Sequence, residues 1–411
     1  MDLRSSAAIW DRPANELAAD PLVADVDCDV AIIGSGISGA LAAYYVTQTP
    51  GRRVVMLDKR DLSQGSINAS TALLQYEIDT TLVDLAAKVG RTAAERAYQL
   101  CLDAIGEFDA IVRDVCDDCG YARRQSLFLS GDDANASDLY AEYLARRSAG
   151  IAVQYLDRTR LKADYGIDRS AGLLSRDAAE VDPVRLSRRL LEHSVTHGLA
   201  IHGRTGVKTY TPGPNGVTLT TDAGHTVRAA RVVFCTGYET EDFLGQSYVT
   251  LNSTFAVVSE PVASFDGWRD RCLVWEAQTP YFYCRTTSDN RIIAGGEDEA
   301  TIDPKQRDAM LPEKTAKIAA AFRAMFPTID FRPAKSWAGT FAESHDSLPY
   351  IGAHPKFPGG YFCLGYGGNG ITFALLAARL LRDELAGRVN PDAKLFAFDR
   401  VRSIAPLVTT G

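Results

Sequence analysis

The sequence has no excess of positive charge and no long apolar run. Lys and Arg number 44 against 52 Asp and Glu, a formal net charge of −8. Nucleic-acid-binding domains present basic stripes, so this balance argues against a nucleic-acid partner. No stretch approaches the about eighteen consecutive apolar residues of a membrane-spanning helix. The first 25 residues carry acids and prolines instead of the apolar core of a signal peptide. We therefore expect a cytoplasmic protein without a membrane span.

Histidine and cysteine are also scarce, with six and eight residues in a chain of 411. Eight cysteines in so long a chain do not make a disulfide framework. Cys116 and Cys119 form a single CxxC, and neither a second CxxC nor paired histidines accompany it to complete a zinc site. We predict no metal site, and the role of this pair is left open between ordinary thiols and a redox pair.

Residues 29–58 carry the clearest pattern in the chain. A short apolar run at 30–33 is typical of a strand buried on both faces of a parallel sheet. A glycine-rich turn at 34–39 leads into an apolar helix, and a second apolar strand at 54–57 ends at Asp58. This is a βαβ unit.

The glycines of this unit have the spacing of a dinucleotide-binding turn. Gly34 permits the tight turn, Gly36 lets a pyrophosphate approach the backbone, and Gly39 lets helix and strand pack closely. Unpaired N–H groups at the helix start then face the phosphates. Asp58 lies nineteen residues after Gly39, where a carboxylate can accept hydrogen bonds from ribose hydroxyls. The unit therefore predicts dinucleotide binding.

The remaining chain supplies a second set of elements. The whole chain is longer than the size at which a single hydrophobic core keeps growing, so we expect two domains or a discontinuous pair. A polar segment at 60–71 follows the second strand, at the sheet edge where open α/β folds bind ligands. Helical periodicity marks 92–115 and 312–325, and antiparallel-looking strands at 255–259, 272–276, 281–285 and 291–294 suggest a sheet that roofs a pocket. A buried strand at 231–235 ends at Thr236-Gly237, and a second glycine loop at 365–372 opens an apolar helix that presents N–H groups to its surroundings.

Taken together, these stretches resemble the D-amino-acid-oxidase-like superfamily of FAD-dependent oxidoreductases, whose members include glycine, sarcosine and gamma-glutamylputrescine oxidases. The resemblance rests on GSGISG at 34–39, the acid at 58, GSINAST at 65–71, CTG at 235–237, W-x-G at 337–339, DSLPYIG at 346–352 and GYGGNGIT at 365–372. It implies an α/β fold (α+β overall), with a Rossmann-type FAD-binding domain and a discontinuous mixed β-sheet substrate domain.

The resemblance also implies domain limits and cofactor contacts. We expect a leader at 1–25, an FAD-binding domain at 26–90, 171–245 and 335–411, and a substrate domain at 91–170 and 246–334. The FAD, held non-covalently, is expected to contact Gly34, Gly36, Ile37, Ser38, Gly39, Asp58, Lys59, Arg60, Gly65, Ser66, Asn68, Ser70, Thr71, Val207, Thr236, Gly237, Gly339, Gly367, Gly368, Asn369, Gly370, Ile371 and Thr372.

The chain departs from the family pattern at three points. In sarcosine-type relatives a cysteine tethers the flavin. The corresponding neighbourhood of this sequence holds Gly339 and Phe341 instead, so no covalent link is expected. An arginine that clamps the substrate carboxylate after W-x-G-x is replaced by Phe341, and a second arginine in the final glycine loop is replaced by Gly368. Without these two guanidinium groups, the chain lacks the donors that usually bind both oxygens of an α-carboxylate.

Tyr281, Tyr283 and Arg285 share one face of an expected strand because side chains alternate along strands. Arg285 and Arg291 are candidates to replace the missing arginines, although this face could equally be an ordinary sheet surface or contact the flavin edge.

His345 lies in a polar group near the expected active site and could titrate near neutrality. A lone histidine in a turn is more often structural. We take Tyr281, Arg285 and His345 as candidate catalytic residues.

The expected activity is oxidation of the C–N bond of an amine or amino-acid-like small molecule by hydride transfer to FAD, with oxygen or another electron acceptor. Two alternatives stay open: oxidation of a C–O bond in a 2-hydroxy acid or polyol phosphate, and a flavoprotein subunit of an electron-transfer complex.

Overall fold

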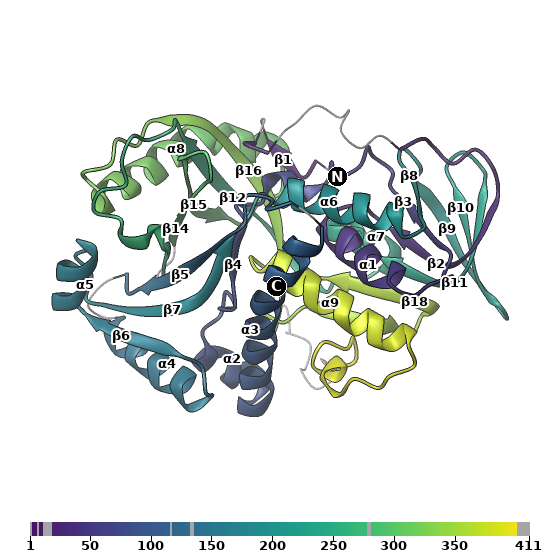
Figure 1. Ribbon diagram of the computed structural model, residues 1–411, viewed down its shortest axis with the longest axis horizontal. Coiled ribbons are helices and arrows are strands. Elements are labelled where there is room, and N and C mark those ends of the chain that lie inside the picture. Colours follow the sequence, from purple (N-terminus) through teal and green to yellow (C-terminus); the bar gives the residue numbers. More distant parts are fainter. Residues whose placement is uncertain are drawn as a thin grey trace, which may run out of the picture.

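A computed structural model describes residues 2–5, 8–10, 19–115, 117–131, 135–277 and 281–400. Within these ranges the chain forms two β-sheets with helices packed on and between them (Figure 1). The helices are α1 (Ile37–Thr47), α2 (Leu82–Val89), α3 (Arg91–Asp114), α4 (Ala136–Ser148), α5 (Arg158–Tyr165), α6 (Pro183–Thr196), α7 (Thr240–Leu244), α8 (Pro304–Met325) and α9 (Gly370–Leu385), with short 3-10 turns η2 (Ser66–Ala69), η3 (Gly237–Glu239), η4 (Arg269–Arg271) and η5 (Pro391–Leu395).

The smaller sheet has eight strands in the described residues and contains the predicted βαβ unit. Its main path runs β17-β18-β11-β2-β3-β8, and β10 pairs with β11 and β9. The strands are β2 (Val26–Ile33), β3 (Val54–Leu57), β8 (Leu199–His202), β9 (Val207–Gly213), β10 (Gly216–Thr221), β11 (Thr226–Phe234), β17 (Tyr350–His354) and β18 (Phe357–Leu364). From β18 to β8 the neighbours are parallel, so their carboxyl ends meet at one edge.

Backbone hydrogen bonds align these strand ends. The Gly34 N–H donates to the Leu57 carbonyl and the Cys235 N–H donates to the Ile33 carbonyl, each at 2.8 Å. The ends of β2, β3 and β11 therefore lie level with one another, and the glycine turn that follows β2 projects beyond them.

The larger sheet has ten strands in the described residues and runs β1-β16-β12-β15-β14-β13-β5-β7-β4, with β6 beside β7. Its strands are β1 (Arg4–Ser5), β4 (Leu73–Gln75), β5 (Ala122–Leu129), β6 (Val153–Asp157), β7 (Ala171–Glu180), β12 (Val249–Ser259), β13 (Leu273–Glu276), β14 (Phe282–Thr286), β15 (Ile292–Glu299) and β16 (Pro333–Ser344). The four strands expected between 255 and 294 are all present as β12 to β15. The sheet also takes in β4, β7 and β16, from segments expected in the other domain, so the domain limits stay a prediction.

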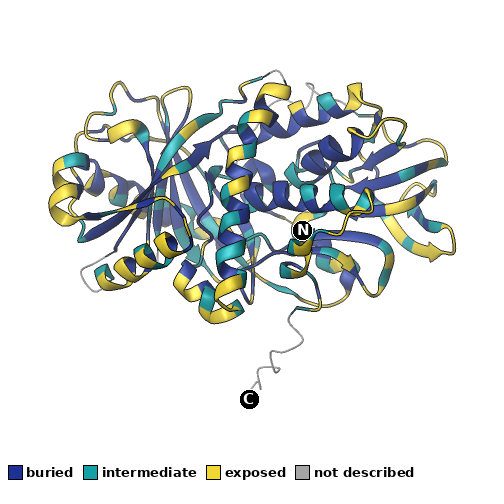
Figure 2. Ribbon diagram, turned by 60° about the horizontal axis from the view of Figure 1, so that its bottom comes forward, coloured by how far each residue is buried: buried dark blue, intermediate teal, exposed yellow. Residues whose placement is uncertain are grey.

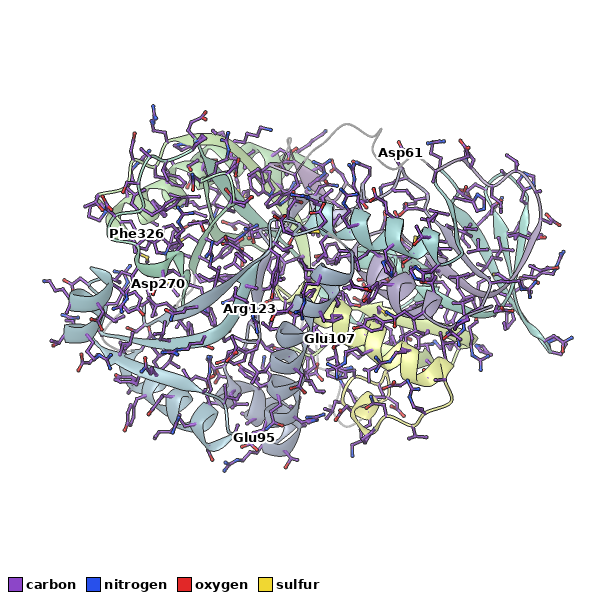
Figure 3. All side chains as sticks on the ribbon, in the orientation of Figure 1. Asp61, Glu95, Glu107, Arg123, Asp270 and Phe326 are labelled. Carbon is purple, nitrogen blue, oxygen red and sulfur yellow. The ribbon has the colours of Figure 1, made fainter. Side chains whose placement is uncertain are left out.

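Helices α1, α6 and α9 pack against the smaller sheet, and α3 packs on α9 and contacts β4 and β7 of the larger sheet, while α8 covers β12, β15 and β16 of that sheet (Figure 1). Buried residues fill the middle of both sheets, while the outer helices are exposed on one side (Figure 2). Glu107 of α3 accepts a hydrogen bond from Tyr45 of α1 and pairs with Arg379 of α9 at 3.4 Å. Arg123 of β5 donates to the Ile105 carbonyl of α3 at 3.3 Å, which ties that helix to the larger sheet (Figure 3).

Helix α8 is longer than the sequence pattern indicates. It begins at Pro304 and not at Pro312, because the Asp303 side chain caps it by accepting the Lys305 and Gln306 N–H groups at 2.8 and 3.0 Å. Proline suits the first turn, where its missing N–H would be unpaired anyway. The predicted start at Pro312 is therefore wrong, since that residue lies inside the helix.

A fully buried arginine stabilises the region between β4 and α4. Arg146 donates to the Glu142 carboxylate at 2.6 Å and lies 3.4 Å from the Glu77 carboxylate. Glu142 in turn accepts the Leu82 and Val83 N–H groups at 2.9 and 3.0 Å, which caps α2. Burial raises the pKa of Glu77, and the positive charge of Arg146 opposes that shift.

Replacing Arg146 by alanine should lower the free energy of unfolding by about 3–5 kcal/mol, because two buried carboxylates lose their cation. Arg147→Ala is the matched control, since the neighbouring side chain is exposed, and should change it by less than about 0.5 kcal/mol. Urea unfolding followed by circular dichroism measures both. Equal free energies of unfolding in the two variants would contradict a stabilising role for the buried arginine.

Candidate functional site

A cavity of about 640 Å³ lies where the carboxyl ends of the parallel strands face the larger sheet. Ile33, Leu57, Cys235 and Leu364 mark the ends of β2, β3, β11 and β18 along its wall. Residues of β12, β14 and β16 form the opposite wall. The cavity therefore sits at the edge of the sheet where the sequence predicted ligand binding.

The first glycine turn forms part of the wall and leaves room for a ligand. A Cβ on Gly39 would lie 1.9 Å from the Gly34 carbonyl oxygen, so only glycine allows α1 to pack this closely on the turn. Gly34 has a φ of +104°, which favours glycine. Around Gly36, by contrast, no atom lies within 4 Å of the position that a Cβ would take, so this glycine faces the cavity.

Asp58 follows β3 and is fixed by the turn. Its Oδ2 accepts the Ser35 N–H at 2.7 Å and the Ser35 hydroxyl at 2.6 Å, and its Oδ1 accepts the Arg60 N–H at 2.8 Å. A carboxylate offers about four acceptor sites, so acceptor capacity remains on the side that faces the cavity.

Lys59 and Arg60 are paired with one buried acid. Lys59 Nζ lies 2.8 Å from Glu239, and the Arg60 guanidinium donates two hydrogen bonds to the same carboxylate at 3.1 and 3.0 Å. Burial acts to raise the pKa of Glu239, yet the hydrogen bonds from Arg60 and Lys59 lower it to about 2. The single Glu239 carboxylate thus offsets one of the two positive charges at this end of the cavity.

The hydroxyl-rich segment at 65–71 is held by three buried donors. The Trp337 indole donates to the Ala69 carbonyl at 2.9 Å, the Trp10 indole to the Ser70 carbonyl at 2.7 Å, and Arg285 Nε to the Thr71 carbonyl at 2.6 Å. These bonds fix the backbone, and Ser66, Ser70 and Thr71 line the cavity.

The second glycine loop brings another helix start to the same space. Asn369 donates from its amide to the Glu77 carbonyl at 2.5 Å, and the Thr372 hydroxyl donates to the Gln75 carbonyl at 3.1 Å. In the described part of the chain no side chain caps either α1 or α9. Both helices therefore leave first-turn N–H groups for a ligand, with the positive ends of their dipoles beside the cavity.

The wall formed by the larger sheet is aromatic. Trp275, Tyr281, Tyr283 and Phe341 all line the cavity. Tyr283 lies across Gly295, where a Cβ would meet the phenol oxygen at 2.3 Å. The wall depends on this glycine, because any side chain there would displace the ring.

Of the predicted cofactor residues, most line this one cavity: Gly34, Gly36, Ile37, Ser38, Asp58, Lys59, Arg60, Gly65, Ser66, Ser70, Thr71, Val207, Thr236, Gly237, Gly339, Gly367, Gly368, Asn369, Gly370 and Ile371. Gly39, Asn68 and Thr372 do not, and each instead supports the wall. Asn68 donates to the Ser63 carbonyl at 2.7 Å. Residues from seven separate stretches are thus brought to one space, and their contacts with a cofactor stay a prediction.

A family model described as FAD dependent oxidoreductase matches residues 29–384. The chain belongs to this family of FAD dependent oxidoreductases. It is similar to glycine oxidase of Geobacillus kaustophilus (strain HTA426), with 25% identity over 393 residues that cover 92% of this chain and 97% of that protein. Gamma-glutamylputrescine oxidoreductase of Escherichia coli (strain K12) is 22% identical over 386 residues, which cover 91% of this chain and 87% of that protein.

Solved structures support the same fold. The crystal structure of glycine oxidase from Geobacillus kaustophilus has a TM-score of 0.76 at 20% identity and covers 89% of this chain and 96% of its own. The crystal structure of L-proline dehydrogenase from P. horikoshii has a TM-score of 0.75 at 17% identity, covering 92% and 99%. The α/β fold class is confirmed.

The cavity suits the FAD of an FAD dependent oxidoreductase. Gly36, Gly65 and Gly370 have no atom within 4 Å of a Cβ position, so the backbone is open where phosphates would approach. Two uncapped helix starts supply N–H donors, and Asp58 supplies acceptors for ribose hydroxyls. The donor and acceptor groups present match those that the cofactor requires.

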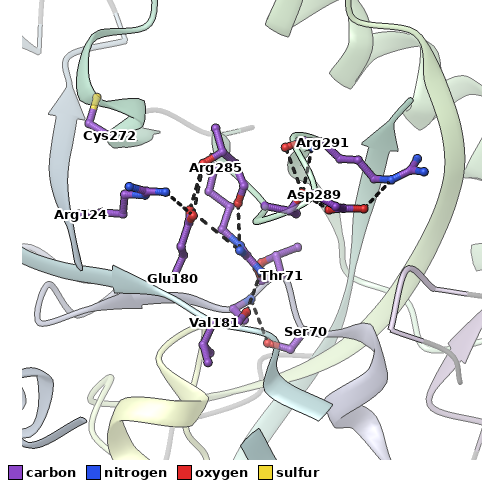
Figure 4. A network of polar contacts seen from close by, with 12 residues as sticks. Ser70, Thr71, Arg124, Glu180, Val181, Cys272, Arg285, Asp289 and Arg291 are labelled. Carbon is purple, nitrogen blue, oxygen red and sulfur yellow. Dashed lines mark hydrogen bonds and ion pairs between the residues drawn. The ribbon is translucent and has the colours of Figure 1, made fainter. Parts of the chain in front are cut away.

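Two of the three predicted catalytic residues, Arg285 and His345, do not line the main cavity, and the catalytic roles of all three stay a prediction. Arg285 is 1% exposed and donates to the carbonyls of Thr71, Thr286 and Val181 at 2.6, 2.9 and 2.9 Å, so its donors are used by the backbone (Figure 4). Burial lowers the pKa of Arg285 to about 10. Arg291, the other candidate arginine, pairs with Asp289 at 2.9 Å (Figure 4).

His345 is exposed in the turn after β16 and lines a second, neighbouring cavity. Only Tyr281 of the predicted catalytic set reaches the main cavity. Alternation along β14 did place Tyr283 and Arg285 on one face, but the loop at 65–71 covers the arginine, and this long-range contact has no sequence signal.

Sequence reasoning missed several lining residues, among them Asp79, Trp275, Thr340 and Lys208. Asp79 lies in a loop that follows a three-residue strand, and no motif marks it. Trp275 fell within an expected strand whose partner and facing side could not be assigned.

Cys119 does not line this cavity, and Cys116, the other cysteine of the CxxC, is outside the described residues. Cys119 is a buried free thiol, and burial raises its pKa to about 12. A thiol with so high a pKa is a poor nucleophile at neutral pH.

The described ranges contain no group of three or more His, Cys, Asp or Glu able to hold a metal ion. No helix in these ranges is long and apolar enough to cross a bilayer.

Gly36→Val should weaken FAD binding about tenfold or more while leaving the fold intact, because the added methyl groups enter free space that the cofactor would occupy. Gly106→Ala in α3 is the control, since its Cβ position is equally open but lies on an exposed helix face. Titration of the two apoproteins with FAD measures the difference. Unchanged affinity in Gly36→Val would show that the cofactor does not approach this turn.

Arg285→Met should lower the free energy of unfolding by about 2–4 kcal/mol, because three carbonyl groups lose a charged donor. The substrate concentration at half-maximal rate should stay within about twofold. Thermal unfolding and steady-state kinetics separate the two effects. A large rise in that concentration with unchanged stability would restore Arg285 as a substrate contact.

Proposed function

We propose that this FAD dependent oxidoreductase oxidises the C–N bond of an amine or amino-acid-like small molecule, using FAD that is bound non-covalently. The observation that carries the proposal is one continuous cavity in which two glycine-opened helix starts face an aromatic sheet wall. The names of its relatives support it, since glycine, gamma-glutamylputrescine and L-proline all carry an amine nitrogen.

When bound, FAD would supply the acceptor for a hydride from the carbon next to nitrogen, and water would hydrolyse the resulting C=N bond. The chain's own contribution is to bind, orient and exclude solvent. Gly34, Gly36 and Asp58 would hold the adenosine and pyrophosphate part. The loops at 65–71 and 365–372 would hold the remainder.

The aromatic wall supplies neutral hydrogen-bond donors. Burial, and then the nearby Asp298 carboxylate, raises the pKa of Tyr283 to about 12, and the same two causes raise the pKa of Tyr281 further. Both phenols therefore stay protonated at neutral pH, and the Tyr281 hydroxyl donates to the Asp298 carboxylate. A neutral amine needs no protein base for hydride transfer.

Non-covalent attachment follows from the residues beside the W-x-G motif. Gly339, Thr340 and Phe341 line the cavity there, and none of them can form a thioether with a flavin. The electron acceptor is oxygen or another oxidant. A cytoplasmic location fits the seven free, buried cysteines among the described residues, because thiols stay reduced in that compartment.

Anaerobic titration with amines, amino acids and 2-hydroxy acids tests the proposal. An amine or amino acid should bleach the flavin absorbance of the purified protein, and acid precipitation should release all flavin into the supernatant. Rapid return of colour in air would identify oxygen as the acceptor, and slow return would identify another one.

Bleaching by hydroxy acids alone would replace C–N with C–O oxidation. Failure of every small molecule to reduce the flavin would contradict an enzymatic role and favour an electron-transfer subunit.

A further inference from the structure

The charged residues that line the main cavity form two groups, and the group beside β3 and β9 contains the acids Asp58, Asp222 and Glu239 as well as bases. The basic ones in the described chain are Lys59, Arg60 and Lys208, which lie beside β3 and at β9. Beside the second glycine loop the charged lining residue is Asp79. On that side of the cavity, the described lining residues therefore offer a carboxylate to a substrate, and no arginine or lysine.

Asp79 occupies the space directly above the second glycine loop. It accepts the Gly368 N–H, and a Cβ on Gly368 would lie 2.6 Å from its Oδ2 and 2.8 Å from its Oδ1. Gly368 does not have a positive φ, so the backbone there would accept a side chain if the carboxylate were absent. An acid at 79 and a long side chain at 368 thus exclude each other, and this chain has the acid.

The surroundings of Asp79 contain further acids, which favour its protonated form when no cation is bound. Its neighbours Glu343 and Asp298 are also carboxylates, and burial together with their charges raises the pKa of Asp79 to about 6, while the Gly368 N–H opposes the shift. Glu343 is held by the Asn252 amide at 2.6 Å. The positive charge of Lys314 lowers the pKa of Asp298. The Lys314 ammonium group is already paired with Glu299 at 2.6 Å.

Aromatic faces and buried hydroxyls, that of Thr340 among them, complete this side of the cavity. Tyr281, Phe341 and Tyr366 line it together with Asp79. Thr340 also lines it, is 5% exposed, and its hydroxyl has no hydrogen-bond partner within the described residues. A carboxylate with aromatic faces is the arrangement that binds organic ammonium groups, and a buried hydroxyl without a partner indicates a polar ligand atom.

Asp79 also lines the neighbouring cavity of about 640 Å³, together with Asn252, Glu343 and Lys88. Tyr366 is shared by both cavities. Asp79 therefore stands at their junction, and an extended molecule can pass it and continue between the two spaces.

We propose that the substrate is a di- or polyamine without an α-carboxylate, and that Asp79 holds one of its ammonium groups while a second nitrogen is oxidised. The inference rests on the proposed C–N oxidation and adds its substrate class. An α-carboxylate would face Asp79 and two further acids, so a simple amino acid is disfavoured by like-charge repulsion.

Three four-carbon amines of different charge test the inference: 1,4-diaminobutane, butylamine and 4-aminobutanoate. The flavin of the holoenzyme should be reduced at the lowest concentration by the diamine and least readily by the amino acid. Asp79→Asn, which keeps an acceptor for the Gly368 N–H, should raise the half-saturating diamine concentration about tenfold or more and change that for butylamine by less than twofold. Asp103→Asn, an exposed acid on α3, is the control.

The pH dependence gives a signature that a purely structural role would not produce. A cation binds to the ionised form of Asp79, so diamine binding should strengthen as the pH rises through about 6. The groups that face Asp79 are Glu343, Asp298 and Tyr281, with Lys88 and His345 across the second cavity. Asp79→Asn should lose this limb of the profile, and its persistence would overturn the assignment to Asp79.

Reversing the charge is the strictest test. Asp79→Ala combined with Gly368→Arg should shift the preference from 1,4-diaminobutane toward 4-aminobutanoate, because the space left by the acid then holds a cation. A double variant that folds, retains FAD and keeps the diamine preference would overturn the inference.

Binding of 1,4-bis(trimethylammonio)butane, followed by perturbation of the flavin spectrum, separates this inference from the proposed function. If amines reduce the flavin but neither the diamine nor this dication depends on Asp79, the substrate class is wrong and C–N oxidation stands. If the dication binds through Asp79 and no amine reduces the flavin, C–N oxidation is wrong.

Discussion

The position of the whole cavity depends on the contact between α1 and the turn that follows β2. The Cα of Gly39 approaches the Gly34 carbonyl so closely that a Cβ would lie 1.9 Å from its oxygen. This places the first turn of α1 directly beyond the aligned ends of β2, β3 and β11. Because α9 packs against α1, the second helix start is brought beside the first. The two dipoles then point at one space, which the larger sheet closes from the other side.

The larger sheet supplies shape and solvent exclusion, while the loops supply polarity. Trp10, Trp337 and Arg285 use their donors on the backbone of residues 69–71, so buried polar groups that could compete for a ligand are already satisfied. The aromatic wall contributes neutral phenols. Charged residues line the cavity beside β3 and β9, where acids accompany Lys59, Arg60 and Lys208, and beside the second glycine loop, where Asp79 lies. An uncharged middle with charged ends selects for molecules whose own charge is distant from the reacting carbon.

Local patterns predicted the elements that are encoded locally. The βαβ unit, the helix at 91–114 and the four strands between 249 and 299 follow from apolar spacing and glycine positions, and the order of motifs predicted the family. Features set by distant contacts were not accessible. Arg285 shares a strand face with Tyr283, yet its guanidinium donates to the Thr71 carbonyl of the loop at 65–71 and does not line the cavity. Asp79 becomes part of the site because it reaches Gly368, 289 residues further along the chain, and nothing in either segment alone indicates this contact. The early start of α8 could have been predicted, since Asp303-Pro304 is an ordinary helix-opening pair.

The central claim is that two separate glycine loops and the segment between them hold one FAD molecule. Hydrogen exchange on the apoprotein and on the same protein reconstituted with FAD tests it directly. The account predicts that amides in 34–39, 58–71 and 365–372 gain protection together on a single binding curve. Protection confined to 34–39, with no change in the other two segments, would contradict it.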